Sequence, residues 1–200
     1  MASSALLIAC GALAHELVEL QRRNEWEHIR IQCLPARLHN RPERIADAVA
    51  AAIEKYRDEY EHIFIAYADC GTGGRLDRVV EKYNVERIPG AHCYEFFAGT
   101  KAFNEFAEAE PGTYYLTDFL TRHFDRLVIK GLGIDRHPEL KEQYFGNYRK
   151  LLFLAQSGAD ELSALARKHA DFLGLQYAEH RTGLKPFENI IGEQVVRWRN

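Results

Sequence analysis

Short apolar runs alternate with longer amphipathic segments over the first ninety residues. Apolar runs at 5–9, 29–34 and 63–68 predict buried strands, and each is followed by a segment with apolar residues three or four positions apart. These segments, at 12–23, 42–60 and 75–83, predict helices. An alternation of buried strands and helices is typical of a parallel sheet with right-handed crossovers. We therefore predict an α/β fold with a mostly parallel sheet flanked by helices.

The second half of the chain is less regular. Further strands are predicted at 85–88, 113–117, 151–154 and 175–179, and an edge strand at 194–198. Helices are predicted at 91–97, 118–127, 139–148 and 160–172. Residues 99–112 are predicted to lack regular structure, and 131–138 to form a loop. With no linker in evidence, we predict a single α/β domain over residues 1–200, with a second lobe over about 113–200 as the alternative.

Composition narrows the class of protein. A hydrophobic content of 46% supplies a core for the 200 residues, and a net charge of -3 without basic runs predicts no nucleic-acid partner. No apolar segment is long enough to span a bilayer, so we predict no membrane association. The apolar residues before Cys10 lack the basic start of a signal peptide, which favours a first strand in a cytoplasmic protein.

Three of the four cysteines follow predicted strands. Cys10, Cys70 and Cys93 each lie where a strand gives way to a helix. The carboxyl ends of parallel strands share one edge of a sheet, where ligands bind in open α/β folds, and His39 lies in a loop of the same edge. Three thiolates with one imidazole suit zinc, and three thiolates alone suit an iron–sulfur cluster with an open iron. His92 is the substitute ligand or an outer neighbour.

Simpler explanations stand beside this one. A reduced cysteine is often just a small core residue, and we interpret Cys33 in this way because it lies inside a predicted strand. Three cysteines at equivalent junctions favour a site over coincidence. We therefore predict Cys10, His39, Cys70 and Cys93 as the metal ligands.

A glycine-rich turn surrounds the second of these cysteines. Its backbone N–H groups and one cation suit a phosphate or carboxylate, although neither the P-loop nor the dinucleotide spacing is present. An ordinary tight turn is the alternative. The residues of this predicted cofactor-binding turn are Gly71, Thr72, Gly73, Gly74 and Arg75.

Acid–base groups flank the cysteines. Asp69 and Glu95 are in position to orient a histidine or move a proton, and with His92 they form the predicted catalytic set. Acids beside turns are more often helix caps or solvated groups.

Several motifs together resemble an uncharacterised family, domain of unknown function 1638. The resemblance implies that the cysteines and histidines above belong to one pattern, and that the protein accompanies corrinoid-dependent methyltransferase systems. The resemblance does not imply which metal or ligand these cysteines and histidines bind. The motifs are Cys10-Gly11-Ala12, Leu34-Pro35-Ala36, Leu38-His39-Asn40 with Pro42, Tyr67, Cys70-Gly71, His92-Cys93, and Pro111-Gly112-Thr113-Tyr114-Tyr115-Leu116-Thr117.

From residues and resemblance together we predict a cytoplasmic, metal-dependent enzyme. Zinc is the expected metal and an iron–sulfur cluster the alternative. The enzyme would act on a small molecule in one-carbon or methyl-group metabolism, through methyl transfer or lyase-type chemistry, with a corrinoid protein or methyltransferase as partner. A non-catalytic carrier of metal or corrinoid for a methyltransferase is the second hypothesis. An α/β scaffold with buried cysteines and an anion-binding turn is the third.

Overall fold

Two compact units make up the chain, Met1–Cys93 with Glu188–Asn200, and Tyr94–Phe187. The computed structural model describes residues 5–199. Each unit contains an all-parallel sheet flanked by helices, so the predicted α/β class is confirmed, with the strands divided between two sheets. The sequence analysis predicted a single domain over residues 1–200. Residues 1–4 and 200 of that range lie outside the described residues.

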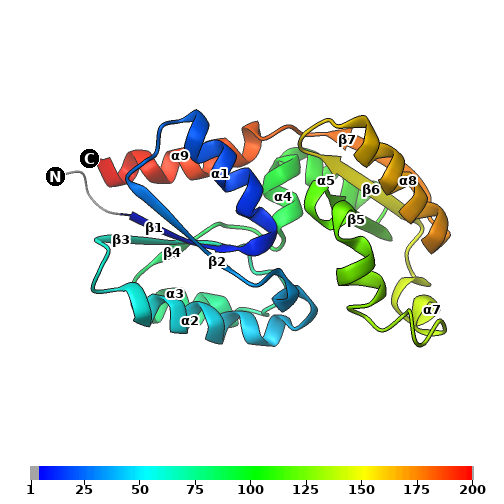
Figure 1. Cartoon of the computed structure of the whole chain (residues 1–200), viewed down its shortest axis with the longest axis horizontal. Helices are drawn as coiled ribbons and strands as arrows, with labels where there is room; N and C mark the ends of the chain where they lie inside the picture. Colours follow the sequence, from blue (N-terminus) through cyan, green and yellow to red (C-terminus); the bar gives the residue numbers. More distant parts are fainter. Residues whose placement is uncertain (1–4, 200) are drawn as a thin grey trace. The chain divides into compact units, whose positions relative to one another are not determined.

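The first unit holds a four-stranded sheet in the order β2-β1-β3-β4. In Figure 1, α1 and α9 cover one side of this sheet while α2 and α3 cover the other. Crossover connections of this kind place helices on both faces of a parallel sheet. The bounds are β1 (Ala5–Cys10), α1 (Ala14–Arg23), β2 (Ile29–Leu34), α2 (Ile45–Tyr56), β3 (His62–Ala66), α3 (Arg75–Tyr83), β4 (Glu86–Arg87) and α9 (Lys185–Arg199), with 3-10 turns η1 (Gly11–Leu13), η2 (Ala36–Asn40) and η3 (Pro42–Arg44).

Strand β1 is the centre of this unit. All six of its residues are buried, because helices cover it on both sides and β2 and β3 pair with both of its edges. Leu17 and Leu20 of α1, and Val49 and Ile53 of α2, are buried in the same unit. A continuous apolar strand with two covered faces is the pattern that the sequence predicted.

The second unit holds a three-stranded sheet in the order β5-β6-β7. Helix α8 packs against β6 and β7. Phe103 and Phe106 of α5 contact Tyr115 of β5 and His180 of β7. The bounds are α4 (Cys93–Ala98), α5 (Thr100–Ala109), β5 (Thr113–Thr117), α6 (Asp118–Arg122), the π-helical turn η4 (Asp125–Ile129), α7 (Leu140–Phe145), β6 (Lys150–Ala155), α8 (Asp160–Leu173) and β7 (Gln176–Arg181).

Two predicted segments are wrong. Residues 99–112 contain helix α5. Its small apolar face consists mainly of Phe103 and Phe106, which are too few to give a clear helical pattern in the sequence. Residues 194–198 belong to helix α9 and form no edge strand. The apolar residues of α9 recur every four positions from Phe187 through Ile191 to Val195, so the pattern begins before the segment that was assigned to a strand.

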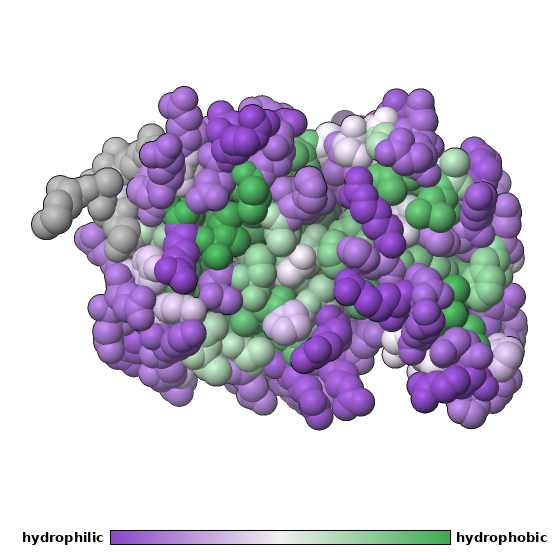
Figure 2. All heavy atoms as spheres, in the orientation of Figure 1, coloured by the Kyte–Doolittle hydropathy of each residue, from purple (hydrophilic) through white to green (hydrophobic). Residues whose placement is uncertain are grey.

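Polar side chains cover most of the surface visible in Figure 2. The large apolar side chains that remain exposed are Val18 and Val196 in the first unit and Tyr144 and Phe172 in the second. They lie on four different helices. Of the described helices, none combines the length and apolar character that crossing a membrane requires.

Candidate functional site

The carboxyl ends of β1, β2 and β3 lie together in register. Cys10 pairs with Leu34, and Ala9 pairs with both Cys33 and Ala66. The loops that follow these strands therefore start at one edge of the sheet. They carry Cys10, His39 and Cys70, which all belong to the first unit.

Cys10 is the last residue of β1 and also caps the turn that follows. Its Sγ accepts a hydrogen bond of 3.3 Å from the Ala12 N–H and lies 3.5 Å from Nδ1 of His39. Gly11 permits this approach, since a Cβ there would lie 2.8 Å from the carbonyl oxygen of Leu34. The Cys10-Gly11 pair thus holds the loop after β2, and with it His39, against the sulfur.

The same loop reaches the second cysteine. Pro42, just beyond His39, lies against Gly71, where an added Cβ would be 3.5 Å from the proline ring. His39 also interacts electrostatically with Cys70. The imidazole therefore stands between two sulfur atoms that come from neighbouring strands.

Cys70 has an unusual backbone. Its φ is 50°, in the left-handed region that non-glycine residues rarely adopt and that occurs preferentially at functional sites. Its N–H donates to the carbonyl of Ala91 at 2.8 Å, and the N–H of Asp69 donates to Gly90 at 3.1 Å. These bonds tie the loop after β3 to the loop after β4 and bring Cys93 into hydrogen-bonding contact with Cys70.

The electrostatics of these groups are coupled. The hydrogen bond from Cys93 lowers the pKa of Cys70, burial raises it, and His39 lowers it further, with a net result of about 5. The bond to Cys70 and burial hold the pKa of Cys93 well above its ordinary value. Desolvation by neighbouring groups lowers the pKa of His39, but its interactions with Cys10 and Cys70 outweigh this and raise the pKa well above its ordinary value. The arrangement stabilises a Cys70 thiolate beside an imidazolium.

Sequence reasoning missed Tyr67 as a member of this group. It follows β3 directly, is 1% exposed, and stacks loosely on His39, with ring centroids 6.4 Å apart. Its hydroxyl interacts with Cys10, and burial followed by this interaction raises its pKa. Within the described residues, the hydroxyl has no hydrogen-bond partner of normal geometry. The sequence analysis named Tyr67 only among the family motifs, and it gave Tyr67 no role because a buried tyrosine at the end of a strand resembles any core aromatic.

The carboxylate of Asp69 organises the glycine-rich turn. It accepts hydrogen bonds from Thr72 Oγ1, from the Gly73 N–H at 3.1 Å and from the Gly74 N–H at 3.0 Å. Burial raises the pKa of Asp69, but these bonds outweigh it and lower the pKa. Two of the N–H groups assigned to an external anion thus already face an internal one. Anion binding by Gly71, Thr72, Gly73, Gly74 and Arg75 stays a prediction.

The other predicted catalytic groups lie around the start of α4. His92 is exposed and precedes Cys93, the first residue of that helix. Glu95 lies in the first turn of α4 and belongs to the second unit. Their catalytic roles, and that of Asp69, stay predictions.

The predicted ligands form a chain of neighbours, from Cys10 to His39, to Cys70, to Cys93. Among residues 5–199, however, no three His, Cys, Asp or Glu side chains are arranged so that they could hold a metal ion. All four cysteines are free thiols. Convergence on one ion therefore requires side chains at this edge to rotate.

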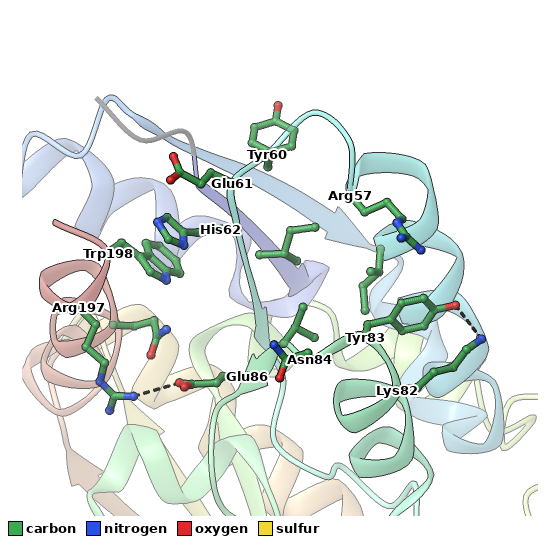
Figure 3. Close-up of a pocket in the computed structure, with 14 residues that line it drawn as sticks. Arg57, Tyr60, Glu61, His62, Lys82, Tyr83, Asn84, Glu86, Arg197 and Trp198 are labelled. Carbon is green, nitrogen blue, oxygen red and sulfur yellow. Dashed lines mark hydrogen bonds and ion pairs between the residues drawn. The ribbon is translucent and has the colours of Figure 1, made fainter. Parts of the chain in front are cut away.

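A hollow of about 540 Å³ lies in the first unit where β3 and β4 begin, at the opposite end of the strands from the cysteines. Figure 3 shows Trp198 beside His62, and Arg197 directed at Glu86, at a distance of 3.0 Å. Lys82 lies 3.1 Å from the Tyr83 hydroxyl. Lys82 and Arg197 thus have partners within the cleft, whereas Arg57 pairs with Glu54, which does not line it. The sequence held no motif that would have located this cleft.

Comparison with known proteins adds a family. The family model described as "Protein of unknown function (DUF1638)" matches residues 33–191. No curated protein and no solved structure matches the chain.

Proposed function

We propose that this chain, which belongs to the family described as Protein of unknown function (DUF1638), is a metal-dependent enzyme acting on a small molecule. Cys10, Cys70 and Cys93 are the permanent ligands of the metal. His39 is an exchangeable fourth ligand that a substrate displaces.

The proposal is supported by the placement of these residues at one edge of the sheet, with Cys10 Sγ 3.5 Å from His39 Nδ1, and by the electrostatic coupling of His39 and Cys93 to Cys70. Cys10 is buried, Cys70 and Cys93 are half-buried, and His39 is exposed. A catalytic metal site keeps three protein ligands and one position open to solvent or substrate. The exposed imidazole occupies the position where exchange is easiest.

Zinc suits these donors best. Thiolate and imidazole ligands in a four-coordinate set are typical of zinc, whereas three thiolates with His39 displaced would also suit a cluster with one open iron. The Ala12 N–H that donates to Cys10 is the kind of outer hydrogen bond that stabilises a ligating thiolate. Metal binding would rotate the side chains of this chain of neighbours until their donor atoms meet.

The chemistry follows from an exchangeable position. Zinc acts as a Lewis acid toward a small one-carbon or amine substrate, or holds a thiol as the nucleophilic thiolate. Methyl transfer or lyase-type chemistry in methyl-group metabolism, with a corrinoid protein or methyltransferase as partner, is the context that the resemblance implies. Unpaired thiols suit the reducing cytoplasm, which is the compartment that we propose.

Metal analysis of anaerobically purified protein tests the proposal. We expect one zinc per chain in the wild type and in Cys33→Ala, and none in Cys70→Ala, with near-UV circular dichroism unchanged in both variants. A brown protein with iron and sulfide would replace zinc by the cluster. Metal that is absent from the wild type, or retained fully by Cys70→Ala, contradicts the assignment.

The loose arrangement of the donors favours a second candidate, a carrier that gives up its metal. Donors that must rotate together around an exposed His39 suit an ion that leaves readily. Transfer of zinc to a chelator within seconds, without turnover of methylated thiols or amines, supports the carrier. Slow exchange with turnover supports the enzyme.

A further inference from the structure

The cleft where β3 and β4 begin is lined wholly by residues of the first unit. Its volume of about 540 Å³ is that of a small-molecule site, since such sites measure about 300–1,000 Å³. They combine an apolar lining with a few polar groups that fix the orientation of the ligand. The cysteines lie at the other end of the strands, so the chemistry of a ligand here is decided by the cleft's own side chains.

Part of the lining is apolar. Ile53 is buried, whereas Ile63 and Val85 are half-buried and keep apolar area exposed to the cleft. The half-buried rings of Tyr60 and Tyr83 line the same cleft. Covering exposed apolar area is favourable, and a flat ring gains further from contact with aromatic side chains. A planar apolar body therefore suits this part of the cleft.

The charged groups of the cleft are divided between its two sides. Figure 3 shows Arg57 and Lys82 on one side, and the carboxylates of Glu61 and Glu86 on the other, toward Trp198 and Arg197. Arg197 is paired with Glu86 at 3.0 Å. The positive charge that is left without a carboxylate inside the cleft is thus that of the first side.

Both cations of this side are able to accept another partner. Lys82 donates to the Tyr83 hydroxyl at 3.1 Å and, among residues 5–199, forms no ion pair. Arg57 lies 3.5 Å from Glu54 and 3.9 Å from Asp58, whereas strong charge-assisted hydrogen bonds measure about 2.7–2.9 Å. Exposed ion pairs of this kind contribute little to stability. Glu54 also keeps a hydrogen bond of 2.6 Å from Tyr83 if Arg57 turns away.

We propose that this cleft binds a small aromatic anion, with its ring over Ile63 and Val85 and its carboxylate or phosphate group between Arg57 and Lys82. A guanidinium pairs with either group through two parallel hydrogen bonds, and an ammonium adds a point charge. A ring without charge would leave the two cations unused, and an anion without a ring would leave the apolar lining uncovered. The inference is independent of the proposed metal site.

Isothermal titration calorimetry of the full chain with matched probes tests this inference. The probes 2-naphthoate and 2-naphthyl phosphate carry a ring and an anionic group, 2-naphthol carries the ring alone, and inorganic phosphate carries the charge alone. The variants are Arg57→Gln and Lys82→Gln. Arg22→Gln is the control, because Arg22 is an exposed, ion-paired arginine of α1, which covers the other face of the first sheet in Figure 1.

We expect the wild type to bind at least one of the two ring-bearing anions about tenfold or more tightly than 2-naphthol or inorganic phosphate. Arg57→Gln and Lys82→Gln should each weaken this binding by about tenfold, because each removes a charge-assisted hydrogen bond. Arg22→Gln should stay within about twofold of the wild type, because it removes only an exposed ion pair away from the cleft. Tighter binding of 2-naphthoate supports a carboxylate ligand, and tighter binding of 2-naphthyl phosphate supports a phosphate ligand.

Several outcomes overturn the proposal. Absence of binding of both ring-bearing anions at millimolar concentration removes the site. Equal affinity for 2-naphthol removes the role of the cations, and equal affinity for inorganic phosphate removes that of the apolar lining. Full affinity in both Arg57→Gln and Lys82→Gln places the probe elsewhere on the protein.

A second measurement locates the probe without any substitution. On titration of the wild type with the tighter-binding anion, the amide NMR signals of residues 62–63 and 84–86 should shift, while those of β6 in the second unit stay in place. Shifts in β6 without shifts at the cleft overturn the assignment. Neither result bears on the proposed metal site, which metal analysis tests separately.

Discussion

The backbone N–H of Cys70 donates a hydrogen bond of 2.8 Å to the carbonyl oxygen of Ala91. This bond continues the contact between β3 and β4 beyond their paired residues, and it holds the backbone of Cys70 beside the loop that leads to Cys93. The position of Cys70 is therefore set by the fold, although its left-handed backbone, with φ of 50°, is strained for a residue with a side chain.

Because of this strain, the backbone conformation of Cys70 can be tested separately from its proposed role as a metal ligand. We expect Cys70→Gly to be more stable than Cys70→Ala by about 1 kcal/mol, because glycine adopts a positive φ without a steric penalty. Both variants should lose zinc. Urea unfolding and metal analysis of the two proteins check this. If Cys70→Ala were as stable as Cys70→Gly, the loop would have to relax freely, which would contradict a fixed backbone.

Gly11 controls how closely the His39 loop approaches Cys10. In Gly11→Ala the new Cβ would lie 2.8 Å from the Leu34 carbonyl oxygen, so the end of β2 must move. We expect a loss of about 1–3 kcal/mol of unfolding free energy, as for other overpacked sites, and zinc binding weakened by at least about tenfold. Competition with a chromogenic chelator measures the affinity.

Gly158→Ala is the matched control. Gly158 has a φ of 67° but no atom within 4 Å of an added Cβ, and it lies in the second unit. It should lose about 1 kcal/mol through backbone strain alone and keep its zinc affinity. If both variants kept full affinity, the Gly11 contact would not position the site.

The low pKa of Cys70 makes its reactivity depend on pH in an unusual range. In metal-free protein, the thiolate of Cys70 forms as the pH rises through about 5, so alkylation by iodoacetamide should reach its plateau below neutral pH. An unperturbed thiol would react faster up to about pH 9. Peptide mass spectrometry resolves the individual cysteines. Burial raises the pKa of Cys33, which supplies the internal control.

The matching variant is His39→Ala. Because His39 lowers the pKa of Cys70, its removal should move the alkylation midpoint to higher pH. A Cys70 rate that rises without a plateau through pH 8 would contradict the thiolate–imidazolium arrangement.

The sequence predicted the parts of this site that depend on topology. Strand-end rules place Cys10, His39 and Cys70 at one edge because parallel strands end together, and the contacts among them follow that rule. Whether they bind metal stays a prediction. Tyr67 was named only as a motif residue, because its burial beside His39 depends on contacts between distant segments, which no local pattern encodes.

The wrong segments have a similar cause. The buried apolar residues of α9 recur only at every fourth position, so a window that begins at residue 194 contains too little of the period to distinguish a helix from a strand. Nor does any sequence rule divide seven parallel strands between two sheets, since that choice depends on which strands pair. The type of each element, helix or strand, was thus more predictable than which strands pair with one another.

His169 makes the stability of the second unit depend on pH. Its Nε2 lies 3.0 Å from the Thr121 carbonyl oxygen, and its ring stacks on Phe124 at 4.1 Å between centroids. Burial lowers the pKa of His169, although the bond to Thr121 opposes this. The folded state therefore binds fewer protons than the unfolded state, so this contribution is complete above about pH 6.5 and is lost as the pH falls through the folded pKa.

Replacement of this histidine tests the sign. We expect His169→Gln to flatten the decline in unfolding free energy between about pH 7 and pH 5, as measured by urea unfolding at several pH values. His15→Gln, at an exposed position of α1, should follow the wild-type profile. A steeper decline in His169→Gln than in the wild type would contradict the assigned direction.

Trp198 packs the end of α9 against the first sheet. Its indole stacks on His62 of β3 at 5.7 Å and meets Phe64 edge-on at 6.3 Å. The indole Nε1–H of Trp198 donates to Gln194 Oε1 at 3.2 Å. Trp198→Ala removes a large half-buried ring and its hydrogen bond together, so we expect a loss of about 2–3 kcal/mol of unfolding free energy. Val196→Ala, at a 58% exposed position of the same helix, should change it by less than about 0.5 kcal/mol.

Hydrogen exchange of the β3 amides locates the effect, because loss of the indole should raise exchange at residues 62–66 while β6 stays protected. Equal exchange in both strands would mean that α9 does not anchor the first sheet.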